Sequence, residues 1–270
     1  MTDTDKVFSG SIATLYATHL VPLIFEPYAA DMKERVVAAR VSRVLEVAAG
    51  TGVVTRALAT LPNERLSVVA TDLNQAMLDQ AAAVGTDRPV EWRRADAMAL
   101  PFADGEFDAV VCQFGVMFFP DRPRAFSEAR RVLRPGGVFV FSVWDRIEEN
   151  EFADTITTAL AAVFPADPPR FLARTPHGYH DRATIGRDLQ AGGFTRPAGM
   201  DTVTARSRAE SSHVPAIAYC QGTPLRSEIE ARDLSRLGEA TDVAAAAIAR
   251  RFGPRAVDGQ IQAHVVTVER

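Results

Sequence analysis

Lysine is almost absent from this chain. Of its 30 lysine and arginine residues, only Lys6 and Lys33 are lysines. This excludes a P-loop, because that motif needs a Gly-Lys-Ser/Thr sequence. Schiff-base chemistry on a core lysine is not expected either. The short-chain reductases are excluded for the same reason, since they pair a lysine with their catalytic tyrosine.

Cysteines and long apolar runs are also scarce. Cys112 and Cys220 are the two cysteines of the sequence, which excludes a disulfide framework and a four-cysteine zinc site. No run of about 18 apolar residues occurs, and residues 1–10 have no apolar centre, so we expect neither a membrane span nor a signal peptide. We expect a cytoplasmic protein without a metal site. The net charge of −4, with scattered arginines, argues against a nucleic-acid partner.

The residues that are present indicate an α/β protein. The chain has 270 residues, 47% of them hydrophobic, which fits one domain with an insertion or one and a half domains. Residues 11–40 have helical spacing, interrupted by Pro22. Short apolar strands then alternate with helices, a rhythm that predicts right-handed crossovers and a parallel sheet. The predicted strands are 41–47, 66–71, 90–94, 107–112 and 138–144, and the helices are 53–61, 74–84 and 122–133.

The rhythm changes after Trp144. Residues 146–180 are rich in proline and predict irregular structure, whereas 210–252 are helical in pattern. Residues 181–192 predict a helix, 200–207 a strand, and 261–269 a late edge strand. The expected organisation is 1–40 as N-terminal helices, 41–145 as core, 146–180 as a cap insertion, 181–209 as core continuation, 210–255 as a helical cap insertion and 256–270 as the terminal core strand.

Polar residues and glycines gather where the predicted strands end. They occupy 46–52, 71–73, 95–97 and 112–115. In an open parallel sheet, ligands bind at the carboxyl ends of the strands. The regular recurrence of this signal predicts a ligand site along one edge of the sheet.

Each of these residues has a structural alternative to its functional interpretation. Gly50 and Gly52 allow a ligand to approach the backbone, or they simply form a tight turn. Asp72 is placed to accept from ribose hydroxyls, to cap the next helix, or to do both. Asp96 is placed to accept from an exocyclic amine, or it is a surface turn residue.

Five segments resemble those of a known family: 44–52 (VLEVAAGTG), 70–78 (ATDLNQAML), 95–102 (ADAMALPF), 107–113 (FDAVVCQ) and 133–137 (LRPGG). They are similar to the class I S-adenosylmethionine-dependent methyltransferases, in particular the ubiquinone/menaquinone-biosynthesis-like small-molecule branch. The resemblance implies a Rossmann-like, mostly parallel seven-stranded sheet. Its last strand is antiparallel, helices cover both faces, and the N-terminal helices cover the cofactor site.

The resemblance also implies roles for individual residues. Glu46, Gly50 and Gly52 would hold the methionine part of the cofactor, and Asp72 would hold its ribose. The remaining contacts would come from Leu73 against the adenine, from Asp96 and Ala97 at the adenine amine, and from the backbone of Gln113 near the methionine amine. Ala48 stands where the family pattern has a glycine, and its methyl group fits if the φ angle there is negative.

Methyl transfer from a sulfonium is an in-line displacement, in which the protein supplies orientation. S-adenosylhomocysteine is the product, and no metal is needed. A hydroxyl or amine acceptor needs a general base, for which His177, His180 and His19 are candidates. The favoured alternative for His177 and His180 is that they are exposed loop histidines. Candidates for an acceptor pocket, or alternatively for core packing, are Tyr16, Tyr28, Phe114, Met117 and Phe118.

Two other classes of function remain open at this point. One is a nicotinamide oxidoreductase, since Gly50 and Gly52 partly match Gly-x-Gly-x-x-Gly, although Thr55 replaces the third glycine. The other is a non-catalytic protein that binds the cofactor or a partner with the same fold.

Overall fold

The computed structural model describes residues 11–63 and 65–270. Lys6 and the segment 1–10, where no signal peptide is expected, lie outside the described residues. The chain divides into two compact units. One, called the core unit below, comprises Glu26–Val143, His180–Thr202 and His264–Arg270. The other, called the helical unit, comprises the chain up to Phe25, Trp144–Tyr179 and Val203–Ala263.

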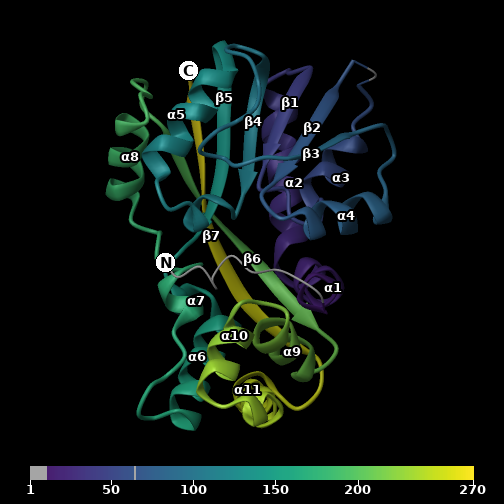
Figure 1. Ribbon diagram of the computed structural model, residues 1–270. Helices are drawn as coiled ribbons and strands as arrows, with labels where there is room; N and C mark the ends of the chain where they lie inside the picture. The colour runs from purple at the N-terminus through teal and green to yellow at the C-terminus, as the bar shows by residue number, and fades with distance from the viewer. Residues whose placement is uncertain (1–10, 64) are drawn as a thin grey trace. The chain divides into compact units, whose positions relative to one another are not determined.

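One sheet of seven strands, in the order β3-β2-β1-β4-β5-β7-β6, organises the fold (Figure 1). Strands β1, β2, β3, β4 and β5 pair in parallel, and the last strand is antiparallel. The predicted fold class is therefore confirmed. The strand bounds are β1 Arg43–Val47, β2 Ser67–Asp72, β3 Glu91–Arg94, β4 Phe107–Gln113, β5 Leu133–Trp144, β6 Gly199–Ala209 and β7 Val257–Glu269.

The central strands form because their side chains are apolar on both faces. Val44, Leu45, Val110 and Val111 are completely buried, as expected for parallel strands covered by helices on both sides. In register, Leu45 lies between Val69 of β2 and Val110 of β4. This register brings the carboxyl ends of β1, β2 and β4 to one edge of the sheet.

The helices of the core unit follow the predicted alternation. Helix α2 packs against α3, and α5 packs against α8 (Figure 1). Asp121 and Asp181 cap α5 and α8 by accepting from the backbone N–H groups of Arg124 and Thr184, which satisfies donors that the helix leaves unpaired. The bounds are α2 Glu26–Ala38, α3 Val53–Ala59, α4 Gln75–Val84, α5 Arg122–Val132, α8 Arg182–Ala191 and the 3-10 turn η3 Val116–Phe118.

The helical unit contains more regular structure than the sequence predicts. Irregular structure was expected over 146–180, but Glu151–Val163 form the helix α6, because the prolines begin only at Pro165. Helix α11 packs against α6 and α9. The bounds are α1 Ser11–Leu15, the π-helix η2 Tyr16–Phe25, η4 Ile147–Glu149, α6 Glu151–Val163, α7 Phe171–Arg174, α9 His213–Gln221, α10 Leu225–Arg232, η5 Leu234–Arg236 and α11 Leu237–Phe252.

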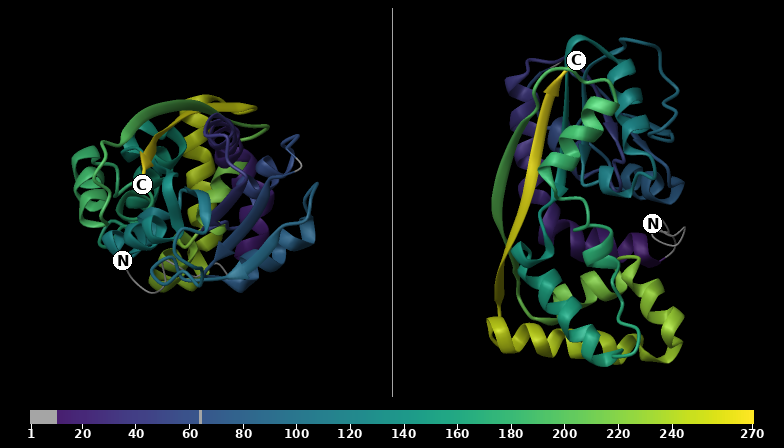
Figure 2. Two further views of the ribbon diagram at one scale, coloured as in Figure 1. Left: turned by 90° about the horizontal axis from the view of Figure 1, so that it is seen from above. Right: turned by 90° about the vertical axis from the view of Figure 1, so that its left-hand side faces the viewer.

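Two further expectations need correction. Strand β7 is not an edge strand, because it lies between β5 and β6, and the edges are β3 and β6; β6 and β7 lie side by side in both views of Figure 2. Pro22 does not interrupt the N-terminal helix but lies inside η2, whose i→i+5 hydrogen bonding makes a wider turn. In the described residues, no helix combines the length and the apolar character that a membrane crossing needs.

Candidate functional site

The predicted site residues meet at the carboxyl edge of the sheet within the core unit. The turn after β1 is tied to the end of β2, since Ala49 N donates to Thr71 O at 2.8 Å and Gly50 N donates to Asp72 Oδ2 at 2.8 Å. The segment after β3 joins them, since Ala95 N donates to Asp72 O at 3.0 Å. Three of the four predicted strand ends are thus connected by hydrogen bonds.

The glycine turn depends on left-handed backbone. The φ angles of Ala48, Gly50 and Gly52 are 55°, 56° and 80°, values that side chains rarely tolerate. At Gly52 the space is also filled by the protein itself, because a Cβ atom there would lie 2.9 Å from Trp92 Cη2. The glycine at 52 is therefore required for packing where α3 begins.

Ala48 departs from the expected geometry. Its φ is positive, whereas a methyl group at this position was expected to fit only with a negative φ. The structure accommodates the methyl group in another way. A Cβ atom built on Gly115, which follows β4, would lie 2.6 Å from the Cβ of Ala48. The missing side chain at Gly115 therefore provides the room for the extra methyl group at 48, and it connects the fourth strand end to the glycine turn.

Glu46 is a buried carboxyl group at the start of this turn. It is 2% exposed, and its Oε2 accepts from Thr55 Oγ1 at 2.5 Å. The pKa of Glu46 is raised to about 8: burial is the main cause and the charge of Asp72 adds to it, while the Thr55 hydrogen bond and the charge of Arg56 oppose the shift. Arg56 was not predicted from the sequence, and Thr55 was considered only as the residue in place of a third glycine. The signal for them was their place in the first turn of the helix that follows the glycines.

The carboxylate of Asp72 accepts two backbone hydrogen bonds, and its contact with ribose stays a prediction. Its Oδ2 accepts from Gly50 N and its Oδ1 accepts from Asn74 N, each at 2.8 Å. The carboxylate therefore fixes the glycine turn and the start of α4 together, and Asn74 itself makes no side-chain cap bond. Burial raises the pKa of Asp72, and its backbone hydrogen bonds oppose that shift.

The remaining predicted cofactor residues line the same edge with different exposure. Leu73 is 43% exposed, an unusual value for a large apolar side chain in this protein. Asp96, Ala97 and Gln113 are half-buried, and Asp96 Oδ1 accepts from Met98 N at 2.9 Å. The edge therefore offers an exposed apolar side chain beside buried carboxyl groups.

The aromatic candidates for an acceptor pocket are mostly packed. Tyr28 is 1% exposed, and its ring meets that of Phe114 edge-on with centroids 5.1 Å apart. Met117 is also buried, and Phe118 is half-buried. Tyr16, in the helical unit, is half-buried, with its ring centroid 5.3 Å from that of Phe25. Core packing accounts for Tyr28, Phe114 and Met117 as observed, and a place in an acceptor pocket stays a prediction for all five.

The histidine candidates differ in environment. His177, in the helical unit, is 5% exposed rather than an exposed loop residue, and its Nδ1 lies 2.9 Å from Asp145 O. Because a carbonyl oxygen only accepts, Nδ1 carries the proton. His180, in the core unit, and His19, in the helical unit, are half-buried. Across residues 11–63 and 65–270, no cluster of three or more His, Cys, Asp or Glu side chains is arranged to hold a metal ion.

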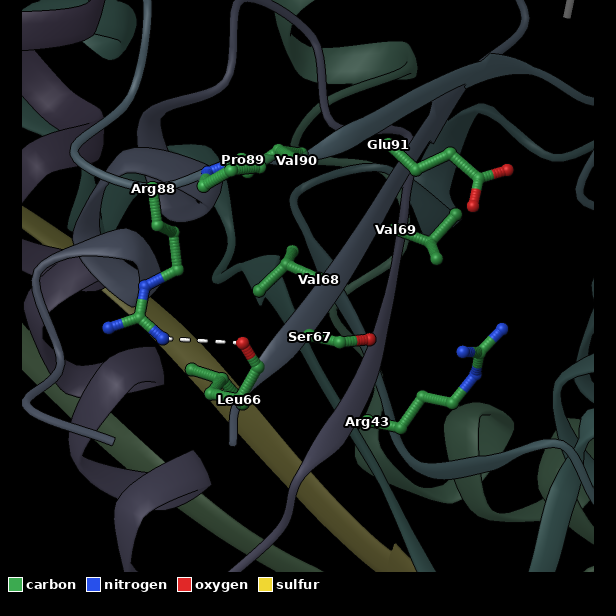
Figure 3. A pocket seen from close by; sticks show the side chains of 9 residues that line it. All are labelled: Arg43, Leu66, Ser67, Val68, Val69, Arg88, Pro89, Val90 and Glu91. Atoms are coloured by element: carbon green, nitrogen blue, oxygen red, sulfur yellow. Dashed lines mark hydrogen bonds between the residues drawn. The ribbon is translucent and has the colours of Figure 1, made fainter. Parts of the chain in front are cut away.

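A separate groove lies at the amino ends of the parallel strands, away from the carboxyl ends that carry the predicted site (Figure 3). It is lined where β1, β2 and β3 begin, by Arg43, Ser67 and Glu91 among others. Arg88, at its margin, donates to Leu66 O. Because this groove is at the amino ends of the strands, it is distinct from the glycine turn and the two buried carboxyl groups.

Comparison with known proteins now bears on this site. Residues 45–141 match the methyltransferase domain family. An uncharacterized protein of Mycobacterium tuberculosis (strain ATCC 25618 / H37Rv) is 42% identical over 106 residues, which cover 38% of this chain and 37% of that one. A ubiquinone/menaquinone biosynthesis C-methyltransferase of Escherichia coli O1:K1 / APEC is 30% identical over 172 residues, covering 56% of this chain and 65% of the other. Residues 45–141 are therefore similar to a methyltransferase domain, and the chain spans 37% and 65% of the length of these two relatives.

The solved structures agree on the fold. A crystal structure from Bacillus halodurans C-125 matches with a TM-score of 0.56 at 20% identity, covering 89% of this chain and 97% of that one. Family and fold together imply S-adenosylmethionine as the cofactor of the domain. The observed edge fits it: the hydroxyl of Thr51, buried in the glycine turn, has no hydrogen-bond partner among the described residues, and Leu73, which follows β2, is exposed.

Proposed function

We propose that this chain is an S-adenosylmethionine-dependent methyltransferase that acts on a small-molecule acceptor. The observation that carries the proposal is the joining of the glycine turn and Asp72 by the Gly50 hydrogen bond, beside the buried Glu46. The proposed methyl transfer needs no metal ion. Action on a small molecule and a cytoplasmic location remain predictions made from the sequence.

The chain's own residues would act mainly by positioning. Bound S-adenosylmethionine supplies the electrophilic methyl group. Glu46 and the turn 48–52 would bind its methionine part, Asp72 its ribose and Leu73 its adenine, with Asp96, Ala97 and Gln113 completing the cradle. Holding the reacting atoms in line lowers the barrier by up to about 7–11 kcal/mol in well-oriented systems.

A base would be needed only for a hydroxyl or amine acceptor. His177 is one candidate for that role, and its Nδ1 carries the proton because it faces Asp145 O. His180 and His19 remain the alternatives.

The nicotinamide alternative has weaker support. Thr55, at the position of the third glycine of a dinucleotide motif, is fully buried and donates to Glu46. The Thr55 side chain thus connects α3 to the Glu46 carboxyl group. It also prevents the close packing of helix on strand that a glycine at this position permits in dinucleotide-binding proteins.

Two measurements test the proposal. Calorimetry should show binding of S-adenosylmethionine and not of NADH, and Asp72→Ala should weaken that binding at least tenfold, about 1.4 kcal/mol. An unchanged dissociation constant would contradict the ribose assignment. Mass spectrometry with labelled cofactor and a panel of small acceptors should then detect methyl incorporation. Binding without incorporation into any acceptor would favour the non-catalytic alternative.

A further inference from the structure

Two carboxyl groups are buried next to one another at the glycine turn. Glu46 is 2% and Asp72 is 8% exposed, and they stand on strands that pair directly, with Glu46 in register with Ala70 and Val47 with Thr71. The negative charge of Asp72 raises the pKa of Glu46. Two like charges in a buried site resist simultaneous ionisation.

The groups packed around Glu46 do not neutralise both charges. Arg56, on α3, is the cation that acts on Glu46, but its Nη1 donates to Thr51 O at 2.6 Å, and its charge also acts on Glu26 of α2. Cys112, on β4, is buried, and its raised pKa keeps the thiol neutral. Thr55 contributes only a hydroxyl. The single guanidinium of Arg56 is thus shared between Glu46 and Glu26, and the support of Asp72 comes from backbone N–H groups.

Asp72 is the acid better supported as an anion. Two backbone N–H groups donate to its oxygens, whereas Glu46 receives one hydroxyl. Hydrogen bonds from N–H groups stabilise the charged form of a carboxyl group. The proton that the pair retains therefore belongs on Glu46, in agreement with its pKa of about 8.

We propose that Glu46 is protonated in the ligand-free protein and releases that proton to solvent when the cationic cofactor binds, so that Glu46 makes the site prefer S-adenosylmethionine to its demethylated product. This inference rests on the proposed function. The cofactor carries a sulfonium, an ammonium and a carboxylate, for a net charge of +1. The product has lost the sulfonium charge and is neutral overall, so it compensates an ionised Glu46 less well.

The test is a count of protons by calorimetry. S-adenosylmethionine is titrated into the purified protein near pH 7 in buffers of different ionisation enthalpy, and S-adenosylhomocysteine is titrated in parallel. The ammonium group of each ligand titrates differently, because the sulfonium charge lowers its pKa in the cofactor, so its proton exchange is measured separately with Glu46→Gln and subtracted. We expect close to one proton released for the cofactor and less than half of that for the product. Between about pH 6 and 8 the affinity for the cofactor should rise by up to tenfold per pH unit.

Glu46→Gln should leave only the proton exchange of the ligand's ammonium group and bring the two affinities closer together. Glu128→Gln is the matched control, because Glu128 is a buried acid of the same unit whose pKa Arg131 holds low, so it is ionised with or without ligand. Infrared spectroscopy provides a readout that needs no variant: the C=O band of a protonated carboxylic acid should be present in the free wild-type protein and disappear with cofactor.

The outcomes separate the two proposals. Cofactor binding without proton release, an equal release in Glu46→Gln, or no carboxylic acid band in the free protein would each overturn the role of Glu46 and leave the methyltransferase proposal standing. Absence of cofactor binding would overturn both.

Discussion

The contact between Ala48 and Gly115 allows a sharp test of how this chain tolerates a side chain in its glycine turn. A Cβ atom at Gly115 would lie 2.6 Å from the Cβ of Ala48 and 2.7 Å from the Sγ of Cys112, whereas carbon atoms pack best at about 3.5–4.0 Å. The Cβ of Ala48 is fixed to the backbone and cannot rotate away. We expect Gly115→Ala to lower the free energy of unfolding by about 2–3 kcal/mol, in the upper range for overpacking.

Removal of the methyl group at 48 should restore part of this loss. In Ala48→Gly the strain of a left-handed alanine, about 1 kcal/mol, is relieved, but the unfolded chain gains a similar amount of freedom, so the single variant should be close to wild type. In the double variant the 2.6 Å contact is gone and the Cys112 contact remains. About half of the lost stability should return, which gives a coupling energy of at least 1 kcal/mol.

Urea denaturation of the four proteins measures this coupling. Gly186→Ala is the control for a glycine-to-alanine change in the same unit, since it lies in α8 and its nearest neighbour is Met200 Cε at 4.0 Å. It should stabilise the protein by about 0.5–1 kcal/mol. Additive effects of the 48 and 115 substitutions, within about 0.5 kcal/mol, would refute the explanation of Ala48.

Three other predictions follow from the same structure. The free energy of unfolding of the ligand-free protein should fall as pH rises from about 5 to 8, by up to about 1.4 kcal/mol per pH unit, because the pKa of Glu46 is raised from 4.5 to about 8 in the folded state. Thermal unfolding of Glu46→Gln should show a weaker dependence of stability on pH. The same dependence in both proteins would contradict this. Arg88→Lys should lower the free energy of unfolding, measured by urea denaturation, by about 1–3 kcal/mol. The reason is that the guanidinium donates to four backbone carbonyls, Ala59 O, Leu61 O, Asn63 O and Leu66 O. Arg65 is exposed, and Arg65→Lys is the control, which should unfold within about 0.5 kcal/mol of wild type. Gly52→Ala should destabilise the fold and weaken cofactor binding, because φ is +80° and Trp92 is 2.9 Å from the added Cβ; wild-type values in both assays would exclude a packing role for Gly52.

The carboxyl edge was predictable from the sequence because it depends on local patterns. A buried β-branched segment that ends in an acid or a glycine identifies a strand end, and parallel pairing then aligns those ends without any knowledge of side-chain contacts. Asp72 and the turn 48–52 were placed together in this way, and the structure connects them through Gly50.

Expectations failed where the outcome depends on contacts between distant segments. The position of β7 between β5 and β6 is a choice of pairing partner, and alternation in 261–269 fits an edge strand as well as an inner one. The φ of Ala48 depends on a residue 67 positions away, Gly115, whose missing side chain is meaningful only once β1 and β4 are paired.

The charge state of Glu46 shows the same limit in the chemistry of the site. The sequence names an acid at the end of β1, and an isolated glutamate is ionised at neutral pH. What changes this is burial between α3 and the sheet and the presence of Asp72 on the neighbouring strand. A motif therefore locates the carboxyl group, but only the packed strands determine whether it acts as an anion or as an acid that holds a proton for exchange with a cationic ligand.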